Sequence, residues 1–157
     1  MHSSSSLLVV LFTVLALFSI TVESKQSVKF GKSFSGKNTW FAGKDAQSVA
    51  CYGDLENNSN VNAEDSWHIA AVNMDSYSGG EKSACFECAK ITYKKRSVIV
   101  RIIDDCEGCA SNQMDLSKDA FNSLAPLSVG EINTKIQWVK CPSKGIKWPK
   151  SPKIKNS

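Results

Sequence analysis

Polar and apolar residues alternate along much of this chain with the two-residue period of a β-strand. In residues 132–138, Ile132, Ile136 and Trp138 share one face and polar residues occupy the other. This alternation predicts a strand that ends near Cys141.

Further strands are expected upstream of this segment. Residues 28–41 end in the triplet Thr39-Trp40-Phe41 and predict one of them. Residues 85–93 and 97–104 predict two more, joined by the basic turn 94–96. The second of this pair carries apolar residues on both faces, so we expect it to be buried on both sides.

Two short helices complete the predicted elements. The first is capped by Asp65 or Ser66, because the residues that follow repeat at helical spacing: Trp67, Ala70, Ala71 and Met74. The second is capped by Ser117, turns Ala120, Phe121 and Leu124 inward, and ends before Pro126. Together the pattern predicts a mainly β domain.

The amino terminus resembles a secretory signal. The apolar run from Leu7 to Val22 is shorter than the roughly 20 residues of a spanning helix. Small residues follow it, so residues 1–24 are expected to be a signal peptide and the protein to be secreted and extracellular. Residues 25–141 form the expected domain, and residues 142–157 a basic, disordered tail.

The six cysteines allow two interpretations. Cys85 to Cys88 and Cys106 to Cys109 are spaced like the ligands of a four-cysteine zinc site. That interpretation leaves Cys51 and Cys141 without a role, and export places the thiols in an oxidising compartment. Three disulfides are favoured, with no metal and no cofactor, but spacing alone does not give their pairing.

The net charge and the distribution of basic residues exclude some classes of partner. The net charge is +4 and the lysines are scattered until the tail, whereas nucleic-acid readers cluster basic residues with aromatics on one element. We expect a monomer that binds neither nucleic acid nor membrane. The sequon at Asn57 predicts an exposed, glycosylated loop.

The order of these elements resembles the double-psi β-barrel domains of expansins, barwin-like proteins and the rare lipoprotein A group. The resemblance runs from about Phe34 to Cys141 and depends on motifs in a fixed order. These are Thr39-Trp40-Phe41, Ala50-Cys51-Tyr52-Gly53, Val100-Arg101-Ile102-Ile103-Asp104-Asp105-Cys106 and Met114-Asp115-Leu116-Ser117. The resemblance implies a six-stranded, disulfide-stapled double-psi β-barrel, in a single-domain secreted form similar to fungal members.

The resemblance also implies disulfide pairings. By analogy with barwin, Cys51 pairs with Cys85 and Cys88 pairs with Cys141. The remaining bridge of barwin uses a cysteine that this sequence lacks, so Cys106 has to pair with Cys109.

In the resembled family a groove is lined by a Thr on the first strand, an Asp ending the central strand and an Asp in an Asp-Leu-Ser motif. Here these residues are Thr39, Asp104 and Asp115. Trp40 and Tyr52 are further candidates for this polysaccharide-binding groove, because aromatic rings stack on sugars.

Asp115 is the candidate catalytic acid, and clustering with Asp104 is expected to raise the pKa of one of the two carboxyl groups by like-charge repulsion. The related family 45 glycoside hydrolases carry their base four residues after the first-strand Thr, where this chain has Gly43. Asp45 lies two positions later, and His68 is the one histidine after the signal peptide. The catalytic pair is therefore incomplete, and we expect a protein that is not an enzyme.

Three functions follow from the resemblance. The favoured one is an expansin-like protein that binds cell-wall glucan, chitin or peptidoglycan and loosens or masks it without hydrolysis. The alternatives are a module that binds a secreted or host protein, such as a protease inhibitor, and a glycan-cleaving enzyme that uses Asp115 as its acid. No carbohydrate-binding second domain is expected after Cys141.

Overall fold

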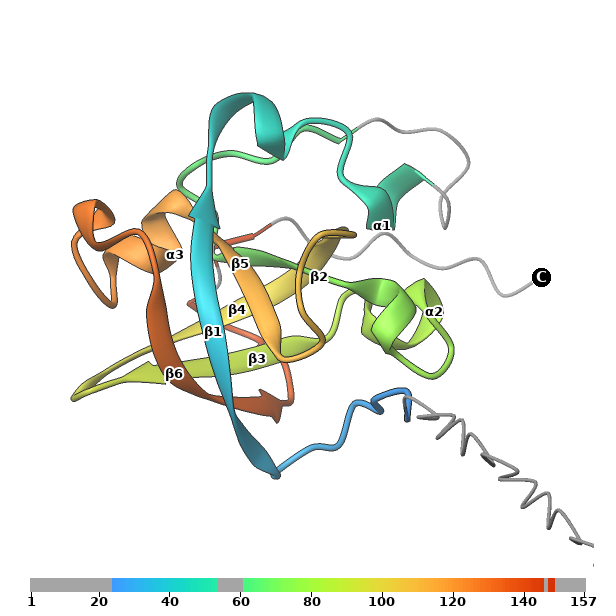
Figure 1. Cartoon of the computed structure of the whole chain (residues 1–157). Coiled ribbons are helices and arrows are strands. Elements are labelled where there is room, and N and C mark those ends of the chain that lie inside the picture. The colour runs from blue at the N-terminus through green and yellow to red at the C-terminus, as the bar shows by residue number, and fades with distance from the viewer. Residues whose placement is uncertain (1–23, 54–60, 146, 149–157) are drawn as a thin grey trace, which may run out of the picture.

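The computed structural model describes residues 24–53, 61–145, 147 and 148. Within them, six strands close into a barrel in the order β1-β5-β2-β4-β3-β6 (Figure 1). The strands are β1 (Ser33–Phe41), β2 (Ile69–Val72), β3 (Cys88–Tyr93), β4 (Arg96–Asp105), β5 (Gln113–Ser117) and β6 (Ile132–Val139). The predicted six-stranded, mainly β fold is confirmed.

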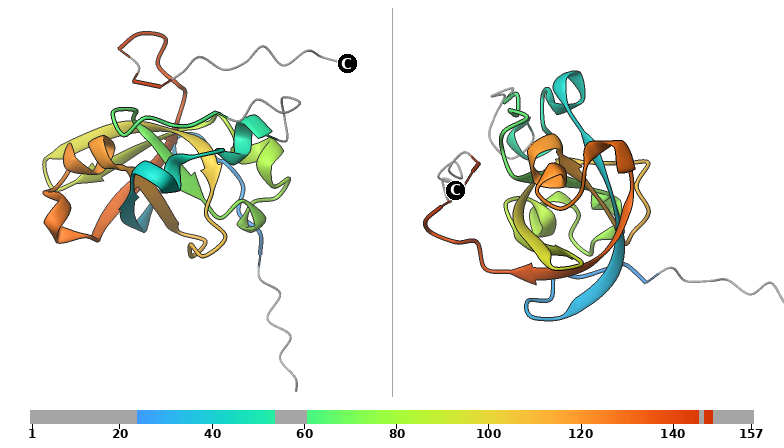
Figure 2. Two further views of the ribbon diagram at one scale, coloured as in Figure 1. Left: turned by 90° about the horizontal axis from the view of Figure 1, so that it is seen from above. Right: turned by 90° about the vertical axis from the view of Figure 1, so that its left-hand side faces the viewer.

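Short helices connect the strands and lie around the barrel, as two further views show (Figure 2). The α-helices are α1 (Ala50–Gly53), α2 (Glu81–Ala84) and α3 (Lys118–Asn122). The 3-10 helices are η1 (Gly43–Ala46), η2 (Met74–Ser76) and η3 (Leu127–Val129). None of the helices in the described part of the chain is long and apolar enough to cross a membrane.

The strand pairing has the mixed directions of a double-psi barrel. β1 runs parallel to β5, and β2 runs parallel to β4. Between these two parallel pairs, β5 and β2 are antiparallel. The antiparallel pair of β5 and β2 thus lies between two parallel pairs. Parallel pairs need crossover connections, so hairpins alone cannot produce this strand order.

The interior is filled by the inward faces of the strands. In β6 buried residues alternate with more exposed ones along the whole strand, as the sequence pattern predicts. In β4 residues 100–103 are all buried, which confirms that both faces of this strand are covered. The largest fully buried side chains include Tyr77, Phe121, Ile69, Ile91, Ile102 and Leu116.

Three disulfides join Cys51 to Cys85, Cys88 to Cys141, and Cys106 to Cys109. All three pairings implied by the family resemblance are thus confirmed. The zinc interpretation is wrong, because every cysteine is used in a disulfide. The bridge from Cys88 to Cys141 ties β3 to the chain just after β6, across 53 residues.

The predicted helix after Asp65 is wrong. Residues 69–72 form strand β2, which is buried throughout and lies between β4 and β5. A short apolar run fits a helix or a fully buried strand equally well, and tertiary pairing decides between them. Asp65 instead accepts a hydrogen bond from the backbone N–H of Gly43 through its Oδ1 atom at 3.0 Å.

The helix expected after Ser117 is present as α3, with Ala120 and Phe121 buried. The Ser117 hydroxyl makes no capping bond to this helix and instead donates a hydrogen bond to the carbonyl of Trp67. Three sequence predictions lie outside the described residues: the signal peptide but for its last residue, the Asn57 sequon and the end of the basic tail.

Gly36 lies where the loop before β5 and a side chain of β6 approach the backbone of β1 closely. It lies in β1 opposite Thr134 of β6. A Cβ atom at this position would lie 2.3 Å from the carbonyl oxygen of Asn112 and 2.4 Å from Cδ1 of Ile136. Only glycine therefore fits where β1 passes the loop before β5.

Gly36→Ala should lower the free energy of unfolding by about 1–3 kcal/mol, the usual cost of overpacking. The matched control is Gly108→Ala, because nothing lies within 4 Å of a Cβ atom at Gly108. Urea unfolding of both variants measures the difference. A Gly36→Ala variant as stable as the control would contradict the close approach.

Candidate functional site

The predicted acidic and hydroxyl residues lie in one row across four strands. Thr39 of β1 is opposite Asp115 of β5, and Asp115 is opposite Ala71 of β2. Ala71 in turn is opposite Asp104 of β4. The barrel therefore brings together three residues that are far apart in the sequence.

A β-bulge places Asp104 in this row. Ala70 is opposite Ile102, but the next residue, Ala71, is opposite Asp104, so Ile103 is the extra residue of the bulge. Bulges are over-represented beside active sites because they re-aim a side chain. Without the bulge the row would contain Ile103 in place of a carboxylate.

Thr39 and Asp115 form the centre of the site. The Thr39 hydroxyl donates a hydrogen bond to Oδ1 of Asp115 over 2.7 Å. The amide of Gln113 donates to the same hydroxyl over 3.2 Å. Gln113 was not a candidate in the sequence, because only the pairing of β1 with β5 shows that it lies beside Thr39.

Burial raises the pKa of Asp115 above its usual value, and the Thr39 hydroxyl partly opposes this shift. The negative charge of Asp45 raises the pKa further. The sequence prediction that repulsion between Asp104 and Asp115 raises one of their pKa values is wrong. The charged neighbour of Asp115 is Asp45, and that of Asp104 is Asp105. Asp45 belongs to η1, whose first residue, Gly43, donates its N–H to Asp65.

Asp104 carries out a structural role. Its Oδ1 atom accepts hydrogen bonds from the backbone N–H groups of Ala50 at 2.9 Å and Asp105 at 3.0 Å. Burial raises the pKa of Asp104, and these two hydrogen bonds lower it. Asp104 thus fastens the start of α1 to β4, beside the row that contains Asp115.

Two predicted groove residues do not face this site. Tyr52 is only 4% exposed and packs edge-to-face against Phe86, with ring centroids 5.3 Å apart, so it offers no surface for a sugar. Trp40 is half-buried and donates its indole N–H to the carbonyl of Leu127 over 3.2 Å. Because successive strand residues point to opposite faces, Trp40 points away from Thr39.

Comparison with protein-family models matches residues 33–136 to a double-psi β-barrel family described as "Lytic transglycolase". The match runs from the start of β1 into β6. The chain belongs to this family.

Solved structures with the same fold include three kinds of protein. The Streptomyces papain inhibitor is 21% identical, with a TM-score of 0.58, over 73% of this chain and 100% of the inhibitor. The Clavibacter michiganensis expansin is 26% identical, with a TM-score of 0.56, over 71% of this chain and 52% of the expansin. Cerato-platanin 3 from M. perniciosa is 16% identical, with a TM-score of 0.50, over 68% of this chain and 95% of the cerato-platanin.

The chain spans about half the length of the expansin that it matches. A mutant of the same expansin has been solved in complex with cellohexaose. The similarity to the papain inhibitor and to the cerato-platanin is evidence for a shared fold alone, because their sequence identities to this chain are low. Among curated proteins no match was found.

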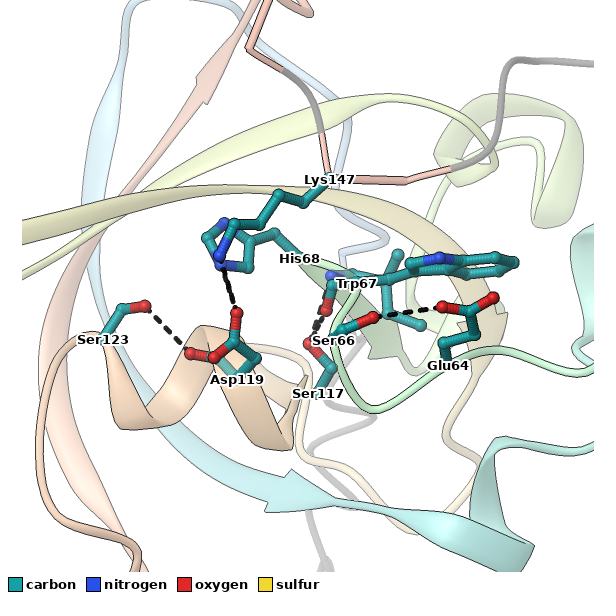
Figure 3. A network of polar contacts seen from close by, with 9 residues as sticks. Glu64, Ser66, Trp67, His68, Ser117, Asp119, Ser123 and Lys147 are labelled. Carbon is teal, nitrogen blue, oxygen red and sulfur yellow. Dashed lines mark hydrogen bonds and ion pairs between the residues drawn. The ribbon is translucent and has the colours of Figure 1, made fainter.

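His68 lies in a separate polar network that holds Lys147 on the barrel (Figure 3). Its backbone N–H donates to the carbonyl of Lys147 over 2.7 Å. Oδ2 of Asp119 lies 3.1 Å from Nε2 of His68 and 2.9 Å from Nζ of Lys147. The next residue, Trp148, is only 8% exposed, so the fold extends beyond Cys141 to this tryptophan.

Trp148→Ala should lower the free energy of unfolding by about 1.5–3 kcal/mol, the range for burying one large apolar side chain. Lys147→Ala should cost less than about 1 kcal/mol, because its ion pair is exposed. Urea unfolding compares the two. A loss in Lys147→Ala as large as that in Trp148→Ala would contradict the dominant role of the buried indole.

Asp115→Asn should stabilise the domain at neutral pH. The raised pKa of Asp115 means that the folded chain holds a proton there more tightly than the unfolded chain does. Ionisation therefore costs stability as the pH rises above the unfolded pKa, and the full cost is present above the folded pKa. Asn removes this cost and keeps an oxygen for the Thr39 hydroxyl.

Thermal unfolding at about pH 3 and about pH 7 measures the effect, since these values bracket the usual range of Asp titration. The difference in Tm between Asp115→Asn and the unchanged protein should be larger at pH 7. Asp75→Asn, which removes an exposed carboxylate on η2, is the matched control. A Tm difference that is independent of pH would contradict the prediction.

The described residues contain no group of three or more His, Cys, Asp or Glu side chains that could hold a metal ion. The row of Thr39 and Asp115 offers hydroxyl, amide and carboxyl groups. Such groups bind sugar hydroxyls, and the burial that raises the pKa of the Asp115 carboxyl favours its protonated form.

Proposed function

We propose that this chain is a secreted, expansin-like protein that binds a cell-wall polysaccharide at the row of Thr39 and Asp115 without hydrolysing it. The observation that carries the proposal is the hydrogen bond of 2.7 Å between Thr39 and Asp115. It fixes a half-buried carboxylate in strand register, and a carboxylate accepts several hydrogen bonds, including those from sugar hydroxyls.

Two further observations support this function. The expansin that was crystallised with cellohexaose is 26% identical over 71% of this chain. The three disulfides favour an extracellular protein, because such bridges persist in oxidising compartments. The polysaccharide is expected to be a glucan, chitin or peptidoglycan.

Binding without hydrolysis follows from the missing second carboxylate. Hydrolysis of a glycosidic bond usually takes two carboxyl groups on either side of the bond. Position 43 is an exposed glycine with a left-handed backbone (φ 62°), so it supplies no such group. Asp115 alone is suited to hold a sugar hydroxyl.

A second candidate function is glycan cleavage with Asp115 as the acid. Burial raises the pKa of Asp115, and a raised pKa favours a proton donor near neutral pH. The family description, which names a lytic activity, and the negative charge of Asp45 nearby also favour this candidate.

One experiment separates the two candidates. The mature protein is incubated with insoluble cellulose, chitin and peptidoglycan, and both its depletion from solution and the release of soluble sugars are measured. Depletion without release is expected. Release of soluble sugars that disappears in Asp115→Asn would contradict the binding function and support cleavage. If Asp45→Asn also abolishes this release, Asp45 is the second carboxylate.

Thr39→Val and Asp115→Ala should each weaken binding to the polysaccharide that depletes the unchanged protein from solution. The expected loss is about 10-fold or more, since a hydrogen bond to a charged group contributes about 1.5–3 kcal/mol. Asp75→Ala again removes an exposed carboxylate elsewhere and should bind normally. Unchanged depletion in Asp115→Ala would contradict the assignment of this site.

A further inference from the structure

A pocket of about 520 Å³ lies at the opposite end of β3 from the Cys88 disulfide. Its walls are residues 93–96, from the turn between β3 and β4, and Leu124, Ala125, Pro126 and Val129, which follow α3. Figures 1 and 2 show this turn beside the segment of α3 and η3. The site around Asp115 does not include these residues.

The polar wall of this pocket is strongly positive. Lys94, Lys95 and Arg96 are consecutive and exposed, and none of the lining residues is acidic. The nearest acidic residue along the chain, Glu131, pairs with Lys37 over 3.1 Å. The three cations are therefore not offset by an acid within the pocket.

The turn that presents these cations is locally unfavourable. Tyr93 is opposite Arg96, so the hairpin closes through the two residues Lys94 and Lys95. Such turns favour Asn-Gly, because their residues adopt positive φ. Lys94 has a φ of 53°, and its amine lies 5.0 Å from the centre of the Tyr93 ring. Lys94 thus occupies a position where glycine or asparagine would be less strained.

The other wall of the pocket is apolar. Leu124, Ala125, Pro126 and Val129 form it, and Val129 is 49% exposed although it is a large aliphatic residue. Apart from the hydroxyl of Tyr93, the lining side chains offer no neutral hydrogen-bonding group. A sugar hydroxyl both donates and accepts hydrogen bonds, whereas the lysine and arginine side chains here only donate them. An aliphatic side chain between two carboxylates instead fits an apolar wall with a cationic rim.

We propose that this pocket is a binding site for an acidic peptide segment of a partner protein, with an aliphatic side chain of the peptide against Val129 and its carboxylates on residues 94–96. Charge complementarity identifies the partner, since three cations face the solvent beside an apolar wall. This site is separate from the row of Thr39 and Asp115, and it does not depend on glycan binding there.

Three labelled peptides test the proposal by fluorescence anisotropy with the mature protein at physiological salt. The first, GDELLEDG, carries both features; GNQLLQNG lacks the charges, and GDESSEDG lacks the aliphatic side chains. The first peptide should bind at least about 10-fold more tightly than either of the others, a difference of about 1.4 kcal/mol.

Two double variants with the same change in charge locate the site. Lys94→Glu with Lys95→Glu should weaken binding of the first peptide about 10-fold or more. Lys82→Glu with Lys140→Glu is the matched control, because Lys82 is in α2 and Lys140 follows Val139, which pairs with Cys88 at the far end of β3. At physiological salt, charges farther away than about 8 Å are largely screened, so this control should bind normally.

Val129→Ser should weaken binding of GDELLEDG several-fold and leave GDESSEDG unchanged. Equal loss in both double variants, or equal binding of all three peptides, would overturn the proposal. Binding of polygalacturonate that depends on Lys94 and Lys95, with no binding of the acidic peptide, would also overturn it in favour of an anionic glycan. Thermal unfolding checks that each variant is folded.

Discussion

The whole structure depends on β1 finding two partner strands from the other half of the chain. On one side it runs parallel to β5 and on the other antiparallel to β6, and these two pairings close the barrel. Close packing at this seam is possible because Gly36 has no side chain. The same seam sets Thr39 opposite Asp115, so the closure of the barrel and the geometry of the candidate site have one cause.

Burial of the two carboxylates at the candidate site costs electrostatic free energy. Asp115 and Asp104 are both half-buried, and burial disfavours their charged forms. Asp104 is compensated by two backbone N–H groups, as structural carboxylates usually are. Asp115 is compensated by the Thr39 hydroxyl and by the backbone N–H of Leu116. Each carboxylate also faces a like charge, Asp45 for Asp115 and Asp105 for Asp104. Carboxylates with raised pKa values cluster at functional sites, which supports the role proposed for Asp115.

The sequence predicted the barrel and its bridges well, because family motifs and alternation are local signals. It failed for β2, since the four buried residues from Ile69 to Val72 carry no alternation. It also assigned Tyr52 to the surface, because nothing near that residue in the chain shows the contact with Phe86. The bulge at Ile103, the role of Gln113 and the burial of Trp148 arise from pairing and packing between distant segments, which a single sequence does not display.

The pairing of the first strand also constrains how the molecule is made. Thr39 contacts a residue 76 positions later, and the last partner of β1 ends at Val139. During synthesis β1 therefore remains an unpaired strand until nearly the whole domain has been translated. Contacts of such long range make folding slow and leave the chain open in the meantime. Closure of the barrel therefore waits until β6 has been made, an order that is compatible with the secretion proposed above.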